Sequence, residues 1–164
     1  MPTMGRATSG GSPAPAAKRG RILAVDYGRK RIGLALSDEL GLAAHPLETM
    51  ARVNRERDMK RLRETCRAHG VTHVIVGHPL HMTGEAGEMA DEAARFAARL
   101  GKATGIGVEL VDERLTSWEA ERTLAETRPR ARRKRKPSDD VAAAVLLRDY
   151  LEKTHGGSHG EERD

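Results

Sequence analysis

The sequence predicts an α/β fold in which helices flank a five-stranded mixed sheet. Three short apolar runs come first with few residues between them, which indicates a meander of three strands. Two further apolar runs alternate with helical patterns, as strands joined by crossover helices do. Hairpin-connected strands pair antiparallel, and crossover-connected strands lie parallel. The predicted sheet therefore contains both kinds of pairing.

The length of 164 residues suggests one domain, which we expect at residues 21–153. Residues 1–20 and 154–164 are rich in small and polar residues and are expected to form disordered tails. No apolar run approaches the roughly 18 residues that would suggest a membrane-spanning helix. The single Cys66 cannot form an internal disulfide. These features favour a reducing, cytoplasmic setting.

The first predicted hairpin presents a carboxylate next to open backbone. The apolar strand Ile22–Val25 ends at Asp26, and a second strand, 31–37, has its larger apolar residues at alternate positions. A third strand is expected between Gly41 and Met50. An acid beside a glycine turn suits a metal ion or a phosphate, and the candidate substrate-binding residues of this turn are Gly28, Arg29, Lys30 and Arg31.

Two helices surround the next strand. Asn54 is expected to cap a helix that ends near His69, with a strongly basic face that a solvated surface explains. The continuous apolar run 71–77 predicts a central strand buried on both faces. The second helix is expected to end at Gly101, and the stripe it buries consists of Met89, Ala93, Phe96, Ala97 and Leu100.

The loop between that strand and that helix has glycines at both ends, Gly77 and Gly84. Such a loop can bind an anion through free backbone N–H groups, although an ordinary strand-to-helix turn is an equally good interpretation. His78 and His81 lie in this loop. Because two histidines without a cysteine or carboxylate partner make a weak metal site, they are interpreted as loop residues.

The last third of the sequence contains a strand, two helices and a basic run. Strand 108–111 leads into Asp112 and Glu113, and Thr116 is expected to cap a helix that reaches Thr127. A final helix is expected from Asp139 to about Lys153.

The basic run between these two helices decides the sign of the net charge. It contributes seven of the 29 basic residues, and the other 22 are outnumbered by the 24 acidic residues. We expect it to contact phosphates, although a purely solubilising role stays open. The candidate contacts are Arg130, Arg132, Arg133, Lys134 and Arg135.

Three acids are candidates for the chemistry: Asp26, Glu113 and Asp139. If the first and last strands are parallel neighbours, Asp26 and Glu113 emerge at the same edge of the sheet. Carboxylates this close repel one another unless a cation is bound, and a pair of Mg²⁺ or Mn²⁺ ions would also support phosphodiester hydrolysis. Each acid also has a structural interpretation, as a turn or first-turn helix residue. The helical pattern does not separate Asp139 from Asp140.

Four blocks of sequence resemble the YqgF family, also called RuvX. They are Ala24–Gly28 with Arg31–Ala35, Gly77 to Gly84, Asp112–Thr116, and Asp139 through Ala142-Ala143 to Tyr150-Leu151. The resemblance implies a ribonuclease H-like fold, similar to Holliday junction resolvases, and a cytoplasmic nuclease that matures the 5′ end of pre-16S ribosomal RNA. It also selects Asp139 over Asp140 as the third catalytic acid. The sequence departs from the family pattern at His78, His81 and Thr83.

The leading hypothesis is a metal-dependent endonuclease that acts on structured RNA or on branched DNA. Its expected partners are pre-rRNA and ribosome assembly intermediates, and a monomer or a homodimer fits equally well. A nucleic-acid-binding assembly factor with a vestigial acidic site is the alternative from another class. A sugar-kinase or actin-like ATPase also opens with Asp-x-Gly on a hairpin, but it requires a second domain for which this chain has no room.

Overall fold

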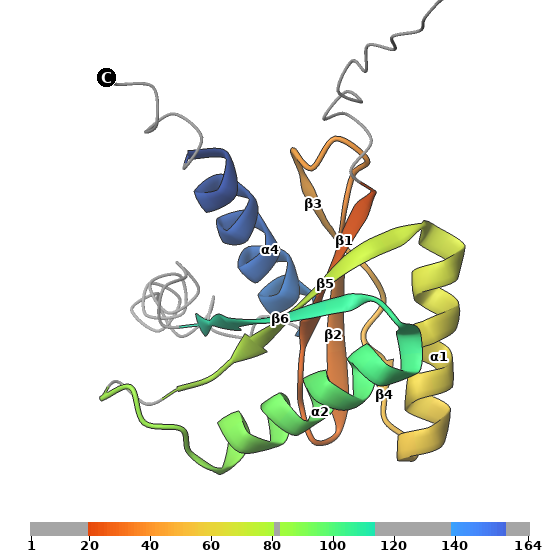
Figure 1. Ribbon diagram of the computed structural model, residues 1–164, viewed down its shortest axis with the longest axis vertical. Coiled ribbons are helices and arrows are strands. Elements are labelled where there is room, and N and C mark those ends of the chain that lie inside the picture. The colour runs from red at the N-terminus through yellow and green to blue at the C-terminus, as the bar shows by residue number, and fades with distance from the viewer. Residues whose placement is uncertain (1–19, 81–82, 114–138, 157–164) are drawn as a thin grey trace, which may run out of the picture.

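The computed structural model describes residues 20–80, 83–113 and 139–156 of the chain (Figure 1). Its strands form one mixed sheet in the order β3-β2-β1-β5-β6, with a short β4 that pairs with β2. The predicted mixed α/β sheet is confirmed. The strands are β1 (Arg21–Asp26), β2 (Arg31–Ser37), β3 (Ala44–Pro46), β4 (Met50–Ala51), β5 (Val71–His78) and β6 (Gly107–Asp112).

The meander at the start of the sheet largely follows the prediction. β1 and β2 pair antiparallel, with Val25 opposite Leu34. The single strand expected between Gly41 and Met50 is instead two short strands on different parts of β2. Because Pro46 has no N–H group to donate, β3 ends there.

Strands β1, β5 and β6 are parallel, and β5 lies between the other two. The first and last strands are thus parallel, but they are not the neighbours that the sequence analysis considered. Each crossover helix adds one parallel strand: α1 connects β4 to β5, and α2 connects β5 to β6. The three strands still end at the same edge of the sheet, because parallel strands share their direction.

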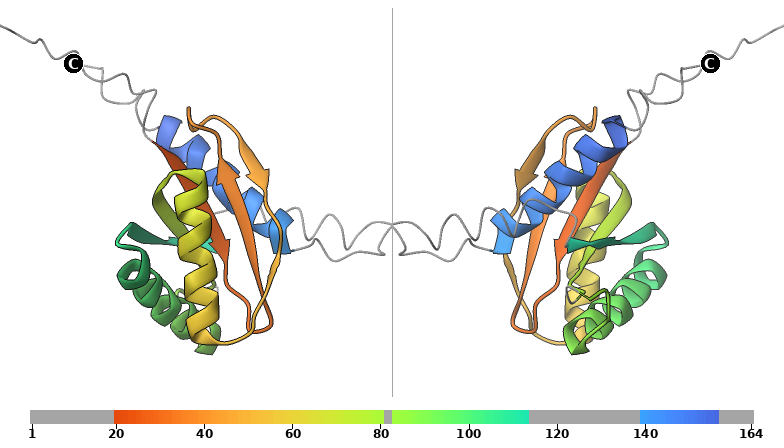
Figure 2. Two further views of the ribbon diagram at one scale, coloured as in Figure 1. Left: turned by 90° about the vertical axis from the view of Figure 1, so that its right-hand side faces the viewer. Right: turned by 90° about the vertical axis from the view of Figure 1, so that its left-hand side faces the viewer.

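Helices cover both faces of the sheet (Figure 2). α1 (Arg55–His69) and α2 (Glu88–Thr104) pack on one face, and α4 (Asp139–Gly156) packs on the other. As predicted, Asn54 caps α1, its side-chain oxygen accepting the Arg57 N–H at 2.9 Å. α2 continues past the expected end at Gly101 to Thr104, and the positive φ of 72° at Gly105 turns the chain out of the helix.

The two faces have separate apolar cores. The core under α1 and α2 includes Leu23, Val25, Ile32, Leu62 and Phe96, all fully buried or nearly so. The core under α4 is smaller. It contains Ala24, Ala35, Ile75, Ala143, Leu146, Leu147 and Leu151.

Several predicted segments lie outside the described residues. They are the helix from Thr116 to Thr127, the basic run that includes Arg130, Arg132, Arg133, Lys134 and Arg135, and most of both predicted tails. The described part of α4 reaches Gly156, beyond the predicted end near Lys153. None of the described helices is long and apolar enough to cross a membrane.

Candidate active site

Acidic residues gather where the three parallel strands end. Asp26 is the last residue of β1, Asp112 is the last residue of β6, and Glu113 follows it. In the register of the sheet, Val25 is level with Val76, and His78 is level with Asp112. The ends of β1 and β6 therefore flank the end of β5. Asp26 and Glu113 are each half-buried at this edge.

Asp26 lies on the α4 face of the sheet. Successive side chains of a strand point to opposite faces. Ala24 belongs to the core under α4, so Asp26, two residues later, points to the same side. By the same rule Gly77 faces α4, because Ile75 is part of that core.

The Glu113 carboxyl group lies against Gly77. A Cβ atom added to Gly77 would overlap the Glu113 carboxylate oxygen and would lie 3.0 Å from its Cδ. Only glycine leaves room for the carboxylate at this point of β5. Because β5 separates β1 from β6, this space lets Glu113 extend over the middle strand toward the β1 side of the edge. Gly77 therefore helps to place the two acids on one face.

The start of α4 belongs to the same region. The Tyr150 hydroxyl, in the second half of α4, lies 3.4 Å from His73 Nε2, near the start of β5. The helix runs opposite to β1 and β5, so its first turn lies toward the carboxyl ends of these strands (Figure 1). α4 begins at Asp139, the third predicted acid, whose side chain is outside the described residues, as is that of Asp140. A helix N-terminus favours nearby negative charge.

The β1–β2 turn presents predicted substrate-binding residues beside Asp26. Arg29 and Lys30 are exposed at this turn, and Arg31 begins β2. The Arg29 Nε donates to Glu92 at 2.9 Å, and its Nη2 lies 3.6 Å from Glu88; both acids are on α2. The hydrogen bond and charge of Glu92 raise the pKa of Arg29. Part of the positive charge of this turn is therefore already balanced.

Tyr27 and Arg52 hold the base of this turn. The Arg52 guanidinium donates to the Tyr27 hydroxyl at 3.0 Å and to the Gly28 carbonyl at 3.3 Å. It also donates to the carboxylate of Asp58 at 3.2 Å, a side chain that is 97% buried. The Val53 N–H donates to the other Asp58 oxygen at 3.0 Å. This role of Arg52 is not evident from the sequence, where the basic residues around α1 were interpreted as a solvated face, because Tyr27 and Gly28 are distant in sequence.

The loop that follows β5 contains the remaining candidates. His78 ends β5 and is half-buried, whereas His81 lies outside the described residues. Among the residues that the structure describes, no group of three histidine, cysteine or acidic side chains could together hold a metal ion. Asp26 and Glu113 offer carboxylate oxygens, the ligands that Mg²⁺ and Mn²⁺ prefer. The donor chemistry fits such an ion, with Asp139 as the expected third ligand.

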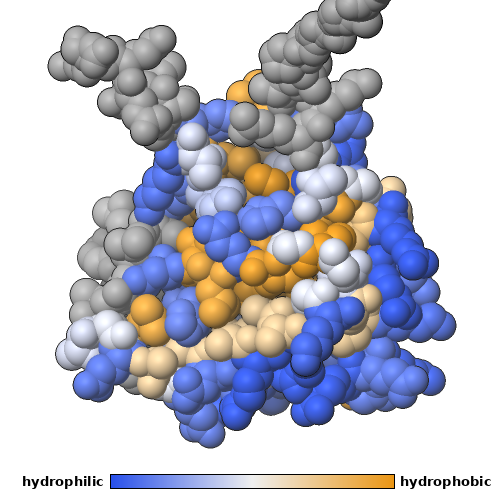
Figure 3. Space-filling model, viewed as in Figure 1, coloured by the Kyte–Doolittle hydropathy of each residue, from blue (hydrophilic) through white to orange (hydrophobic). Residues whose placement is uncertain are grey.

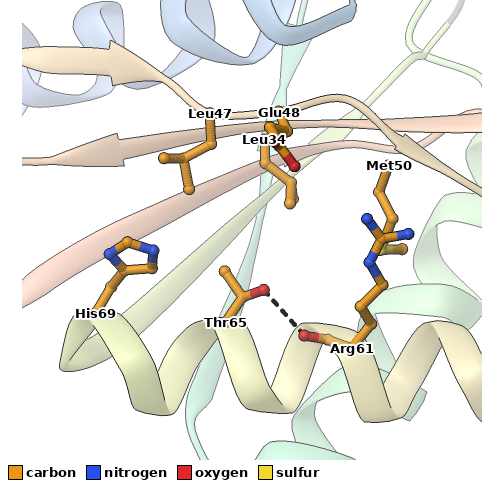
Figure 4. A pocket seen from close by; sticks show the side chains of 7 residues that line it. All are labelled: Leu34, Leu47, Glu48, Met50, Arg61, Thr65 and His69. Carbon is orange, nitrogen blue, oxygen red and sulfur yellow. Dashed lines mark hydrogen bonds between the residues drawn. The ribbon is translucent and has the colours of Figure 1, made fainter.

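A surface pocket of about 280 Å³ lies on the opposite face, between α1 and the strands β2 and β4 (Figure 4). Its walls combine apolar side chains with Arg61, Thr65 and His69 of α1. The Thr65 hydroxyl is already bonded to the Arg61 carbonyl at 2.9 Å. Neither Asp26 nor Glu113 lines this pocket, so the candidate active site is the edge of the sheet near α4.

Comparison with known proteins gives one family. The model of the RuvX family, described as Holliday junction resolvase, matches residues 20–153. Relatives from Opitutus terrae and Symbiobacterium thermophilum are each 46% identical to this chain. Over 133 and 132 residues respectively, they cover 80% of this chain and 91% and 92% of their own lengths. Both carry the name "Putative pre-16S rRNA nuclease".

Solved structures support the fold. The chain is similar to Thermus thermophilus RuvC in complex with a Holliday junction substrate, with a TM-score of 0.54 at 14% identity. That match covers 84% of this chain and 97% of the other. A second T. thermophilus RuvC structure matches with a TM-score of 0.51 at 16% identity, covering 83% and 96%. These likenesses show a ribonuclease H-like fold, as the sequence resemblance implied.

Proposed function

Because the chain belongs to the RuvX family, we propose that it is a metal-dependent endonuclease that processes the 5′ end of pre-16S ribosomal RNA. One observation carries the proposal. The fold brings Asp26 and Glu113 to one face at the end of the parallel strands, although the segment between them makes up most of the domain. This substrate would place the protein in the cytoplasm, with ribosome assembly intermediates as partners.

The chain's own residues would hold the metal and orient the substrate. Asp26, Glu113 and Asp139 would bind Mg²⁺ or Mn²⁺, in our proposal two ions. Bound there, the ions would supply an activated water and charge stabilisation for the leaving oxygen. Gly77 leaves room for the Glu113 carboxylate, and the start of α4 favours the accumulated negative charge.

Basic residues would position the phosphate backbone. Gly28, Arg29, Lys30 and Arg31 at the β1–β2 turn are next to Asp26 in the chain. The run that contains Arg130, Arg132, Arg133, Lys134 and Arg135 immediately precedes α4 in the sequence. It would make contacts that do not depend on base sequence, because such contacts are mainly electrostatic.

Branched DNA is the second candidate substrate. The description of the family as Holliday junction resolvase favours it. A monomer would suffice for a single cut in RNA, whereas paired cuts in a two-fold symmetric junction would require a homodimer. Comparing the two substrates therefore also tests the oligomeric state.

The test is cleavage of a pre-16S 5′-leader RNA and of a four-way DNA junction, side by side. Each is incubated with Mg²⁺, with Mn²⁺ and with chelator. We expect Asp26→Asn to keep its fold and to lose cleavage by at least about 10³-fold, since it removes a charged metal ligand at the reacting centre. Glu64→Gln, which neutralises an exposed acid on α1, is the matched control and should cleave like the wild type.

The pattern of results assigns the function. Metal-dependent RNA cleavage that Asp26→Asn abolishes supports the processing nuclease. Cleavage of the junction alone would move the substrate to branched DNA. Undiminished cleavage by Asp26→Asn would reject the proposed metal site, and intact binding with no cleavage under any ion would favour an assembly factor.

A further inference from the structure

Arginines lie at the start of α1 and in the middle of α2, two helices that pack against each other on one face of the sheet. Arg99 of α2 experiences the charges of Arg55, at the start of α1, of Arg52 just before it, and of Arg95 one turn earlier in α2. We call Arg52, Arg55, Arg95 and Arg99 the arginine cluster. It lies on the face of the sheet opposite to α4.

Arg52 is the fixed member of the cluster. Its bonds to Asp58, Tyr27 and the Gly28 carbonyl leave its guanidinium half-buried in one position. Asp58 is the acid that balances it, and each oxygen of that carboxylate already accepts one hydrogen bond, from Arg52 and from the Val53 N–H. Asp58 therefore has little left to offer the other three arginines.

The other three arginines carry uncompensated charge within the described part of the chain. Among the described residues, no carboxylate lies within ion-pair distance of Arg55, Arg95 or Arg99. Glu88 and Glu92 of α2 are paired with Arg29 instead, and Asp91, one turn before Arg95, forms no ion pair with it among the described residues. Like charges held together without an anion cost free energy. Such an arrangement is typical of a surface that binds one.

Arg99 gives the most direct sign of a missing partner. Its Nε atom is buried and has no hydrogen-bond partner among the described residues. Burial, and then the neighbouring arginines, lower its pKa. A buried guanidinium donor without an acceptor is costly. An oxyanion bound between Arg99 and its neighbours would supply negative charge and acceptor oxygens.

The arginine cluster lies close to the candidate active site but around the edge of the sheet from it. Asp26 faces α4, and the next residue, Tyr27, packs on the other face against Phe96 of α2, with ring centroids 5.1 Å apart. Tyr27 is also the contact between β1 and Arg52. In the space-filling view, hydrophilic side chains cover the surface of α1 and the lower rim of α2 (Figure 3). A chain of phosphates crossing this edge would meet both sites.

We propose that Arg55, Arg95 and Arg99, held beside the fixed Arg52, bind a phosphate of the nucleic-acid backbone while the neighbouring segment lies at Asp26 and Glu113. The proposal rests on the proposed function for the identity of the polymer. The bond donors are guanidinium groups, which match phosphate oxygens in pairs. Tyr27, the aromatic residue bonded to Arg52, is packed on Phe96 and so is not free for base stacking. The site is therefore specific for the backbone and indifferent to sequence.

The test uses the full chain and measures binding without cleavage. The variant Arg55→Gln/Arg95→Gln/Arg99→Gln removes the three uncompensated charges. Its matched control, Lys60→Gln/Arg63→Gln/Arg67→Gln, removes three exposed charges from a stripe of α1 outside the cluster. Binding to the leader RNA and to the DNA junction is followed by fluorescence anisotropy in chelator, over a range of salt concentrations.

We expect the cluster variant to bind about 10- to 100-fold more weakly than the control. The slope of log K against log[salt] should flatten by about 0.7 to 0.9, the amount that the loss of one phosphate contact removes. Inorganic phosphate should raise the thermal midpoint of the wild type and of the control more than that of the cluster variant. The cluster variant should also melt no lower than the wild type, because the mutations relieve repulsion.

The readouts separate this site from the proposed activity. If the wild type cleaves neither substrate but its binding still depends on the arginine cluster, the proposed nuclease activity is rejected and the phosphate site is supported. Equal binding and equal salt slopes for the two triple variants would overturn the phosphate site, even if the wild type cleaves RNA. A phosphate effect on the melting of the cluster variant as large as that on the control would also overturn it.

Discussion

The face of the sheet under α1 and α2 is filled by leucine, isoleucine, valine and phenylalanine, whereas alanine supplies much of the face under α4. β2 shows the contrast within one strand, since Ile32, Leu34 and Leu36 face the large core and Ala35 faces the small one. Small side chains let α4 lie close to the strands. The face under α4 holds the candidate catalytic acids, and the face under α1 and α2 supplies most of the buried apolar surface.

This difference teaches that stability and chemistry are divided between the two faces. Burial of apolar area is the main stabilising contribution, and most of it lies under α1 and α2. The acids at the carboxyl edge need room more than packing, and Gly77 and the small core residues leave that room. Substitutions on the two faces should therefore separate unfolding free energy from cleavage.

The largest expected effect on stability comes from a substitution in the core under α1 and α2. Leu62 of α1 is fully buried there, so Leu62→Ala should lower the free energy of unfolding by about 2 to 5 kcal/mol, through lost burial and the cavity left behind. Cleavage per folded molecule should be unchanged well below the melting temperature. Denaturant unfolding and cleavage assays on the same preparation measure both. A large loss of cleavage with little loss of stability would contradict the division of stability and chemistry between the two faces.

Gly77→Ala should have the opposite effect. The new methyl group overlaps the Glu113 carboxylate, which is the end of a flexible side chain and can swing aside at little cost in stability. The displaced acid should lower cleavage by about 10- to 100-fold, as misplacement of catalytic groups does. Gly101→Ala is the control, because its methyl group would meet Val108 Cγ2 at an ordinary 3.6 Å. If both variants cleave equally, Gly77 does not position Glu113.

The smallest expected effect is on the face under α4, where the contribution of Tyr150 to stability should depend on pH. Burial, followed by the hydrogen bond and charge of Glu109, raises the pKa of Tyr150 to about 12. Its hydroxyl donates to Glu109 at 2.9 Å. A phenol with a pKa raised above its ordinary value of about 10 stabilises the fold below pH 10. That stability is lost as the pH rises from about 10 through 12.

Tyr150→Phe removes both the bond and this titration. It should cost about 1 kcal/mol of unfolding free energy at pH 7. Above pH 10 the stability of the variant should fall less steeply than that of the wild type. Denaturant unfolding at pH 7, 9, 10.5 and 11.5 measures the two curves. Parallel curves across this range would show that Tyr150 does not contribute to the alkaline loss.

Local pattern was enough to predict most of the elements. α1 begins after Asn54 and ends at His69 as expected, and β2 has the predicted bounds, because caps and alternation act over a few residues. The end of α2 was not predictable in this way, since both Gly101 and Gly105 can end a helix. Gly101 packs inside the helix near Val108 of β6, a contact that sequence alone does not show.

The candidate site, too, was predictable only where local sequence pattern decides the structure. The sequence by itself determined that Asp26 and Glu113 end strands and therefore lie at a ligand-binding edge of the sheet, because strand ends are a local property. Only the tertiary structure decided that β5 lies between β1 and β6, that Gly77 makes space for Glu113, and that Arg99 lies near Arg55. These relations depend on strand order and helix packing, which bring together side chains whose separation in sequence carries no signal of contact.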